Sequence, residues 1–79
     1  MTFATYVLQR VHFGTWTVGH QTLVVAVNLN PWVRWIPLAE FPGWKACTKL
    51  EMVYSDTASF ELENLVLGEL GSVGFVMTA

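Results

Sequence analysis

The sequence is poor in charged residues, and this shortage excludes one class of partner. Lys and Arg number four and Asp and Glu six, so that 13% of the 79 residues are charged, against about 25% in average soluble chains. A groove that follows a nucleic-acid backbone needs clustered cations. The four cations are instead scattered along the chain, at Arg10, Arg34, Lys45 and Lys49. We therefore expect no nucleic-acid partner.

Cysteine and histidine are also scarce. Cys47 is the single cysteine, so an intrachain disulfide is excluded, which suits a reducing compartment. The start of the chain lacks the basic and apolar regions of a signal peptide, and this makes the sequence compatible with the cytoplasm. The two histidines, His12 and His20, have no further ligands at a spacing that fits zinc. We expect no metal and no other cofactor.

Motifs of catalysis are absent as well. No glycine elbow surrounds Ser55 or Ser59, and a nucleophilic pair of Cys47 with His20 is similarly unsupported. The glycines within 68–74 lack the lysine that follows a phosphate-binding loop. We predict a protein that is not an enzyme and has no catalytic residues. A small-ligand-binding domain, or an enzyme of unrecognised type, is the second alternative.

Apolar residues, by contrast, are abundant. They make up 53% of the chain, and the mean hydropathy is +0.44. We expect a single domain over residues 1–79, and a chain this short buries only about 60% of the surface that its unfolded form exposes. Some apolar surface should therefore remain exposed, and large exposed apolar patches usually mark an interface. We expect a protein partner, with a homo-oligomer favoured.

The apolar residues are arranged mainly as strands. Residues 21–29 contain an unbroken, valine-rich run, which predicts the central strand of a sheet, buried on both faces. Residues 46–54 alternate, which places Leu50, Met52 and Tyr54 on one face. Further strands are expected at 2–13, 15–18, 60–67 and 73–77.

Turn residues separate these strands. Gly14 should interrupt the first strand region, Ser55–Ser59 is a turn by composition, and Gly68 and Gly71 bracket another turn. The predicted fold is all-β or mostly β, a small antiparallel barrel or curled sheet of about five strands. The alternative is an α+β fold, because residues 2–13 also carry a helical apolar stripe and Ser59 is a possible helix cap.

Residues 30–44 form an aromatic–proline segment. Its three prolines forbid a continuous strand or helix, while Asn30–Pro31 is typical of a helix start and favours one helical turn through residues 32–35. The segment either presents rigid rings to a partner or folds over the sheet and completes the core; the two roles are compatible. Arg34 is placed to stack on a neighbouring tryptophan. The candidate interface residues are Trp32, Arg34, Trp35, Phe41 and Trp44.

These observations predict a module for protein interaction or assembly. It would be a small structural subunit, for example of a virus particle, or an accessory protein or inhibitor that binds a larger complex. The main alternative is a membrane-surface protein, because tryptophan suits the membrane interface. A transmembrane helix is not expected. The uncharged span between Arg10 and Arg34 contains His, Gln and Asn side chains, which are costly to bury in hydrocarbon.

Overall fold

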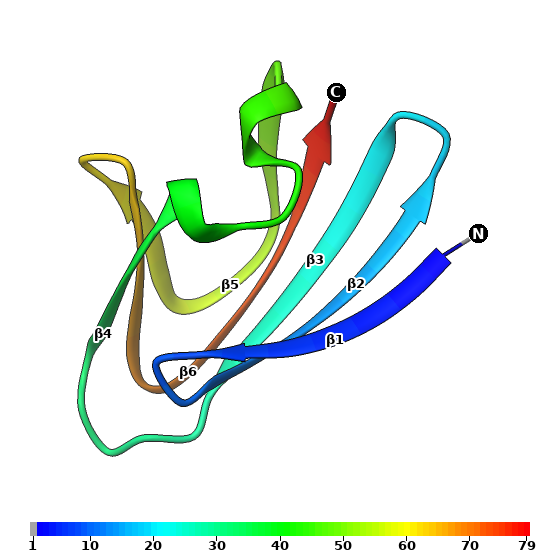
Figure 1. The fold of residues 1–79 in the computed structure, drawn as a ribbon. Coiled ribbons are helices and arrows are strands. Elements are labelled where there is room, and N and C mark those ends of the chain that lie inside the picture. Colours follow the sequence, from blue (N-terminus) through cyan, green and yellow to red (C-terminus); the bar gives the residue numbers. More distant parts are fainter. Residues whose placement is uncertain (1) are drawn as a thin grey trace.

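The computed structural model describes residues 2–79 and shows one antiparallel sheet (Figure 1). The elements in chain order are β1 (Thr2–Leu8), β2 (Val11–Val18), β3 (Gln21–Asn28), β4 (Arg34–Pro37), the short 3₁₀ turns η1 (Leu38–Glu40) and η2 (Trp44–Ala46), β5 (Lys49–Glu61) and β6 (Asn64–Thr78). The mostly-β prediction is confirmed, and the helical alternatives for 2–13 and 59–67 are wrong.

The long strand β6 organises the sheet. β5 pairs with one side of β6, along both the beginning and the end of β6. β3 and β4 therefore share the other side of β6. β3 pairs with the end of β6 and β4 with its beginning, which makes β3 and β4 two parts of one interrupted strand. The sheet is therefore a curled arrangement of about five strands, in the order β1, β2, β3 with β4, β6, β5.

The β1–β2 hairpin differs from the sequence prediction. Its two-residue turn is Gln9–Arg10, both with positive φ (51° and 63°), as tight hairpin turns require. Gly14, expected to interrupt the strand, lies inside β2. A Cβ on Gly14 would lie 3.3 Å from the ring of Trp16, so this glycine makes room for an aromatic ring that covers it. Hydrophobic alternation did not predict this turn. Both turn residues are polar, but they follow the strand residues directly, and no glycine or proline marks the end of the strand.

The sheet bends sharply where β5 and β6 are irregular (Figure 1). Asp56 pairs with Ser72, but Ala58 pairs with Leu67, so four residues of β6 lie opposite Thr57 alone. The expected turn at 55–59 is wrong, because the strand continues through a bulge. The expected turn at 68–71 is wrong for the same reason, since these residues lie within β6 as an unpaired irregularity.

The core lies on the inner face of the curl. It consists of Val11, Phe13, Val24, Ala26, Ile36, Leu38, Phe41, Leu65, Leu67, Val73, Phe75 and Met77. Residues 38–48 connect β4 to β5 and lie between the two arms of the sheet (Figure 1). Phe41 in this connection packs against Phe13 and Phe75, with ring centroids 5.3 and 5.7 Å apart. This part of the aromatic–proline segment completes the core.

The predicted helical turn over residues 32–35 is wrong. Residues 34–37 form β4 and pair with residues 64–67, because β3 ends before it can fill that part of the β6 edge. The helical turns occur further along, at η1 and η2. Proline at the end of β4 is compatible with pairing because it stands at the last position of the strand.

Two further predictions about strand faces need correction. β3 is central, between β2 and β6, but only its inner face is fully buried; Leu23 on the outer face is 37% exposed. No element of residues 2–79 covers that face. Tyr54 does not share a face with Leu50 and Met52, because the register shift between Met52 and Tyr54 turns it outward.

A buried pair of asparagines holds the bend. The Asn28 amide group donates to the carbonyl oxygens of Trp32 at 3.0 Å and Gly68 at 2.9 Å. Its Oδ1 accepts from the backbone N–H and side-chain amide of Asn30, at 3.0 and 2.7 Å, and the latter amide also donates to the Arg10 carbonyl at 3.1 Å. Buried polar groups must be paired, and here the pairing ties together three irregular segments that lack regular strand bonds.

Candidate interaction surface

The structure divides the five candidate interface residues into two groups. Trp32 and Trp35 are 48% and 49% exposed, and the Arg34 guanidinium lies over the Trp32 ring, 5.3 Å from its centroid. The predicted stacking of Arg34 is confirmed. Phe41 is buried, and Trp44 is half-buried against the core. Of the five residues, Trp32 and Trp35 are therefore exposed, Arg34 and Trp44 are half-buried, and Phe41 is buried.

A second apolar surface lies on the outer face of the sheet. Strand register aligns Phe3, Trp16, Leu23 and Val76 in one row across β1, β2, β3 and β6, and neighbouring rows add further apolar side chains. We call this surface the outer patch; its members are Phe3, Val7, Trp16, Val18, Leu23, Val25, Val27 and Val76.

Several members of the outer patch are well exposed. Phe3 and Val7 on β1 are 55% and 54% exposed, and Val18 is 61% exposed. From the usual size of such side chains, the patch presents on the order of 500 Å² of apolar area. A shallow groove of about 250 Å³ lies within it, lined by Trp16, Val18, Gln21, Leu23 and Val76. Apolar patches of this size on a single chain are commonly functional.

Aromatic packing keeps the outer patch rigid at its edge. The rings of Phe3 and Trp16 are in contact, with centroids 4.8 Å apart, and the Trp16 ring covers Gly14. A ring that is fixed by its neighbours loses little conformational entropy when a partner covers it. The arrangement therefore suits binding.

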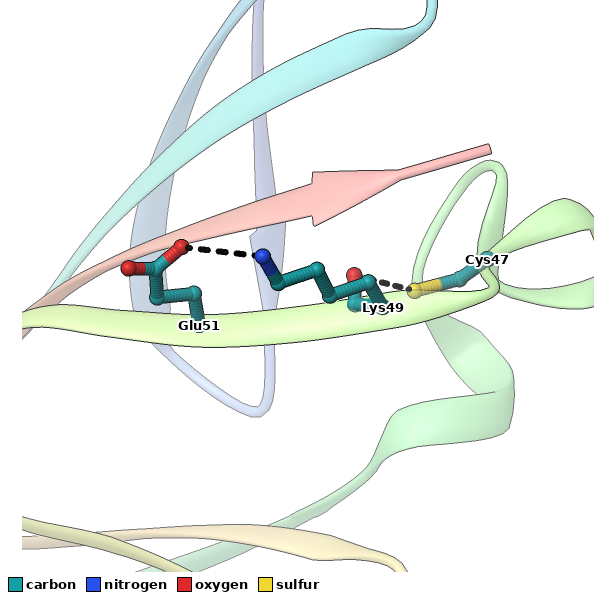
Figure 2. Close-up of polar contacts among 3 residues, drawn as sticks. All are labelled: Cys47, Lys49 and Glu51. Atoms are coloured by element: carbon teal, nitrogen blue, oxygen red, sulfur yellow. Dashed lines mark hydrogen bonds and ion pairs between the residues drawn. The ribbon is translucent and has the colours of Figure 1, made fainter.

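A charged pair borders the outer patch near the beginning of β5, while Tyr54 further along β5 lies beside the patch on the same face. Glu51 pairs with Val76 across the strands, and the Lys49 ammonium lies 3.9 Å from the Glu51 carboxylate (Figure 2). Both side chains are largely exposed, so this ion pair contributes little to stability. Its position at the rim matches the usual plan of interfaces, in which an apolar centre is surrounded by polar residues.

Sequence reasoning missed the outer patch because it assigned both faces of residues 21–29 to the core. Phe3, Trp16 and Leu23 lie on three different strands, and each alternates with inward-facing residues along its own strand. This alternation indicated that each of them faces outward. Only the strand register shows that these side chains form one surface, since they are far apart in the sequence.

A pocket of about 140 Å³ at the open end of the sheet brings together His20 and Cys47. The Cys47 thiol donates to the Lys49 carbonyl oxygen at 3.2 Å (Figure 2). A thiol–imidazole pair needs a direct hydrogen bond for nucleophilic chemistry, and the described residues contain none between these two side chains. Within residues 2–79, no group of three or more His, Cys, Asp or Glu side chains is placed to hold a metal ion.

No protein-family model matches this chain, and no curated protein is similar to it. In the part of the chain that the structure describes, no helix has the length and apolar character needed to cross a membrane.

Proposed function

We propose that this protein is a non-enzymatic assembly module that buries its outer patch against another protein surface, including that of further copies of itself. The observation that carries the proposal is the row of apolar side chains across four strands, left uncovered on a chain with few charges. Burying apolar area stabilises association by about 25 cal/mol per Å². A patch on the order of 500 Å² is below the roughly 800 Å² per partner of a standard interface.

The exposed tryptophans outside the outer patch extend the interaction surface. Trp32 and Trp35 are the kind of large, half-exposed side chains that dominate binding energy at interfaces. Substituting either with alanine should therefore weaken assembly more than Lys49→Ala, because Lys49 contributes only an exposed ion pair.

Leu23→Lys is the sharpest test of the outer patch. Leu23 lies between Trp16 and Val76 in the central row and is exposed enough for a lysine to reach water, so the fold should tolerate the change. Ser59→Lys is the matched control, since Ser59 is an exposed β5 residue outside the outer patch. Light scattering over a dilution series measures the mass of each variant.

The wild-type mass should exceed the 8.9 kDa of one chain and should rise with concentration. At the highest concentration of the series, Leu23→Lys should lower the mass by twofold or more, whereas Ser59→Lys should leave it unchanged. A wild type that stays at 8.9 kDa up to millimolar concentration would overturn the proposal, as would equal masses for the two variants at that highest concentration.

A membrane surface is the second candidate partner. Trp32 and Trp35 are half-exposed near the bend, and tryptophan is enriched at membrane interfaces. The four scattered cations provide no cluster for anionic lipid. Flotation with neutral and anionic liposomes separates the candidates: co-flotation that Trp32→Ala abolishes and Leu23→Lys does not would favour the membrane.

A further inference from the structure

We infer that two copies of this chain pair through their β1 strands, antiparallel and about a two-fold axis at Thr5. The inference deepens the proposed function and rests on it, because it names a second copy of the chain as the first partner. Within residues 2–79, β1 pairs with β2 alone, so it is an edge strand. An edge strand presents a row of unpaired N–H and C=O groups that another strand can bind.

The register of the hairpin identifies the free groups. Leu8 and Val11 flank the two-residue turn, so their backbone groups bond each other and every second residue from there points toward β2. Consistently, the Ala4 carbonyl accepts a bond from the Thr15 hydroxyl of β2, at 3.4 Å. The backbone groups of the intervening residues Phe3, Thr5 and Val7 therefore point away from the sheet.

The edge strands β1 and β5 differ in how they are protected. Folded proteins block edges with charges, proline, bulges or irregular strands. The β5 edge has register shifts at Met52/Tyr54 and Asp56/Ala58 and carries four charged residues, which are Lys49, Glu51, Asp56 and Glu61. β1 has no charge, no proline and an unbroken register over seven residues. Its edge is thus open to pairing.

The β1 sequence is complementary to itself in this register. A two-fold axis at Thr5 places Phe3 opposite the partner's Val7 on the outer face, and Thr5 opposite the partner's Thr5. Aromatic–β-branched and Thr–Thr pairs are both favourable across strands. On the inner face the small Ala4 meets the partner's larger Tyr6. Phe3, Thr5 and Val7 together provide about six backbone hydrogen bonds across the axis.

Pairing at β1 also enlarges the outer patch. Phe3 and Val7 lie on its β1 border, so joining two copies there makes one continuous apolar face of roughly 1,000 Å², less the area that Phe3 and Val7 bury against each other. The joined face is thus comparable to the roughly 800 Å² per partner of a standard interface, which one copy does not reach. The edge-paired dimer is then the unit that binds further protein through its outer face.

Thr5→Pro tests the edge directly. Proline removes an N–H that points to solvent in one copy and is tolerated at such edge positions, so the β1–β2 ladder stays intact. Light scattering at low concentration should show a wild-type dimer, twice 8.9 kDa, and a Thr5→Pro monomer. Leu23→Lys should remain a dimer but should lose larger assemblies. Circular dichroism verifies that each variant is folded.

Cross-linking gives a second readout that does not depend on proline. Thr5 and the partner's Thr5 form a hydrogen-bonded pair whose Cα atoms lie about 5.5 Å apart, a separation that a disulfide can span. In a Cys47→Ser background, Thr5→Cys oxidised with oxidised glutathione should run as a dimer on a non-reducing gel. Ser59→Cys, on the protected β5 edge, should stay monomeric.

The outcomes separate the two proposals. If Thr5→Pro remains dimeric and Thr5→Cys does not cross-link, while Leu23→Lys lowers the mass, the β1 inference fails and the proposed function stands. If Thr5→Pro is monomeric and Leu23→Lys dissociates only the larger assemblies, both stand. A wild type that is monomeric at every concentration overturns both.

Discussion

Replacing Asn28 should destabilise the fold more than its size indicates. The side chain is fully buried and donates to the carbonyl oxygens of Trp32 and Gly68 while it accepts twice from Asn30. In Asn28→Ala these groups lose their partners inside the protein, and each buried unpaired polar group costs about 1–3 kcal/mol. Because the neighbouring chain can relax in part, we expect a total loss of about 3 kcal/mol.

That loss is large for a chain of this length. A stability of about 0.05–0.15 kcal/mol per residue gives roughly 4–12 kcal/mol for the whole protein. Urea unfolding followed by circular dichroism should therefore show a clear fall in the midpoint, and the Tm should drop by roughly 15 °C. Asn28→Asp should lose at least as much at neutral pH, since its second oxygen would face carbonyl oxygens, and should recover partly at low pH, where a protonated carboxyl can donate.

Asn64→Ala is the matched control. The Asn64 side chain also donates to a backbone carbonyl, that of Leu62 at 2.9 Å, but at an exposed turn. Water replaces such a bond, so we expect a loss below about 1 kcal/mol. Equal losses for Asn28→Ala and Asn64→Ala would refute the view that the buried pair holds the bend.

Two further predictions concern glycine contacts and a buried hydroxyl. Gly71→Ala should cost about 2 kcal/mol in thermal unfolding, because its Cβ would lie 2.8 Å from the Asp56 carbonyl oxygen, whereas Gly74→Ala, whose Cβ meets Tyr54 at 3.7 Å, should be nearly neutral. Equal effects would contradict the close approach at the bend. Burial raises the pKa of Tyr6 from 10.0 to about 12, so its contribution to stability should be complete below pH 10 and should fall as the pH rises toward 12. Since the Tyr6 hydroxyl has no hydrogen-bond partner within residues 2–79, Tyr6→Phe should not lower stability at pH 7 and should reduce that alkaline loss; a marked loss at pH 7 would show that the hydroxyl is bonded.

The sequence predicted the fold class but not the details that decide the surface. Hydrophobic alternation, as at Leu50 and Met52, and valine content predicted the strands, because both are properties of a short stretch of sequence. The bulges that turn Tyr54 outward and bend β5 at Thr57 depend on the register with β6, which no local pattern shows. Likewise, Phe41 and Trp32 have the same character in sequence. Only the path of residues 38–48 over the core separates the buried ring from the exposed one.

The position of β6 in the chain has a consequence for synthesis. β6 is the strand against which β3, β4 and β5 all pair, and it is the last strand of the sheet in chain order. While a ribosome is still producing residues 64–78, the valine-rich strand β3 has an open edge and the inner side chains of β2 have no opposing layer. The nascent chain is thus most prone to aggregation just before β6 emerges, when a chaperone would have the greatest effect on yield.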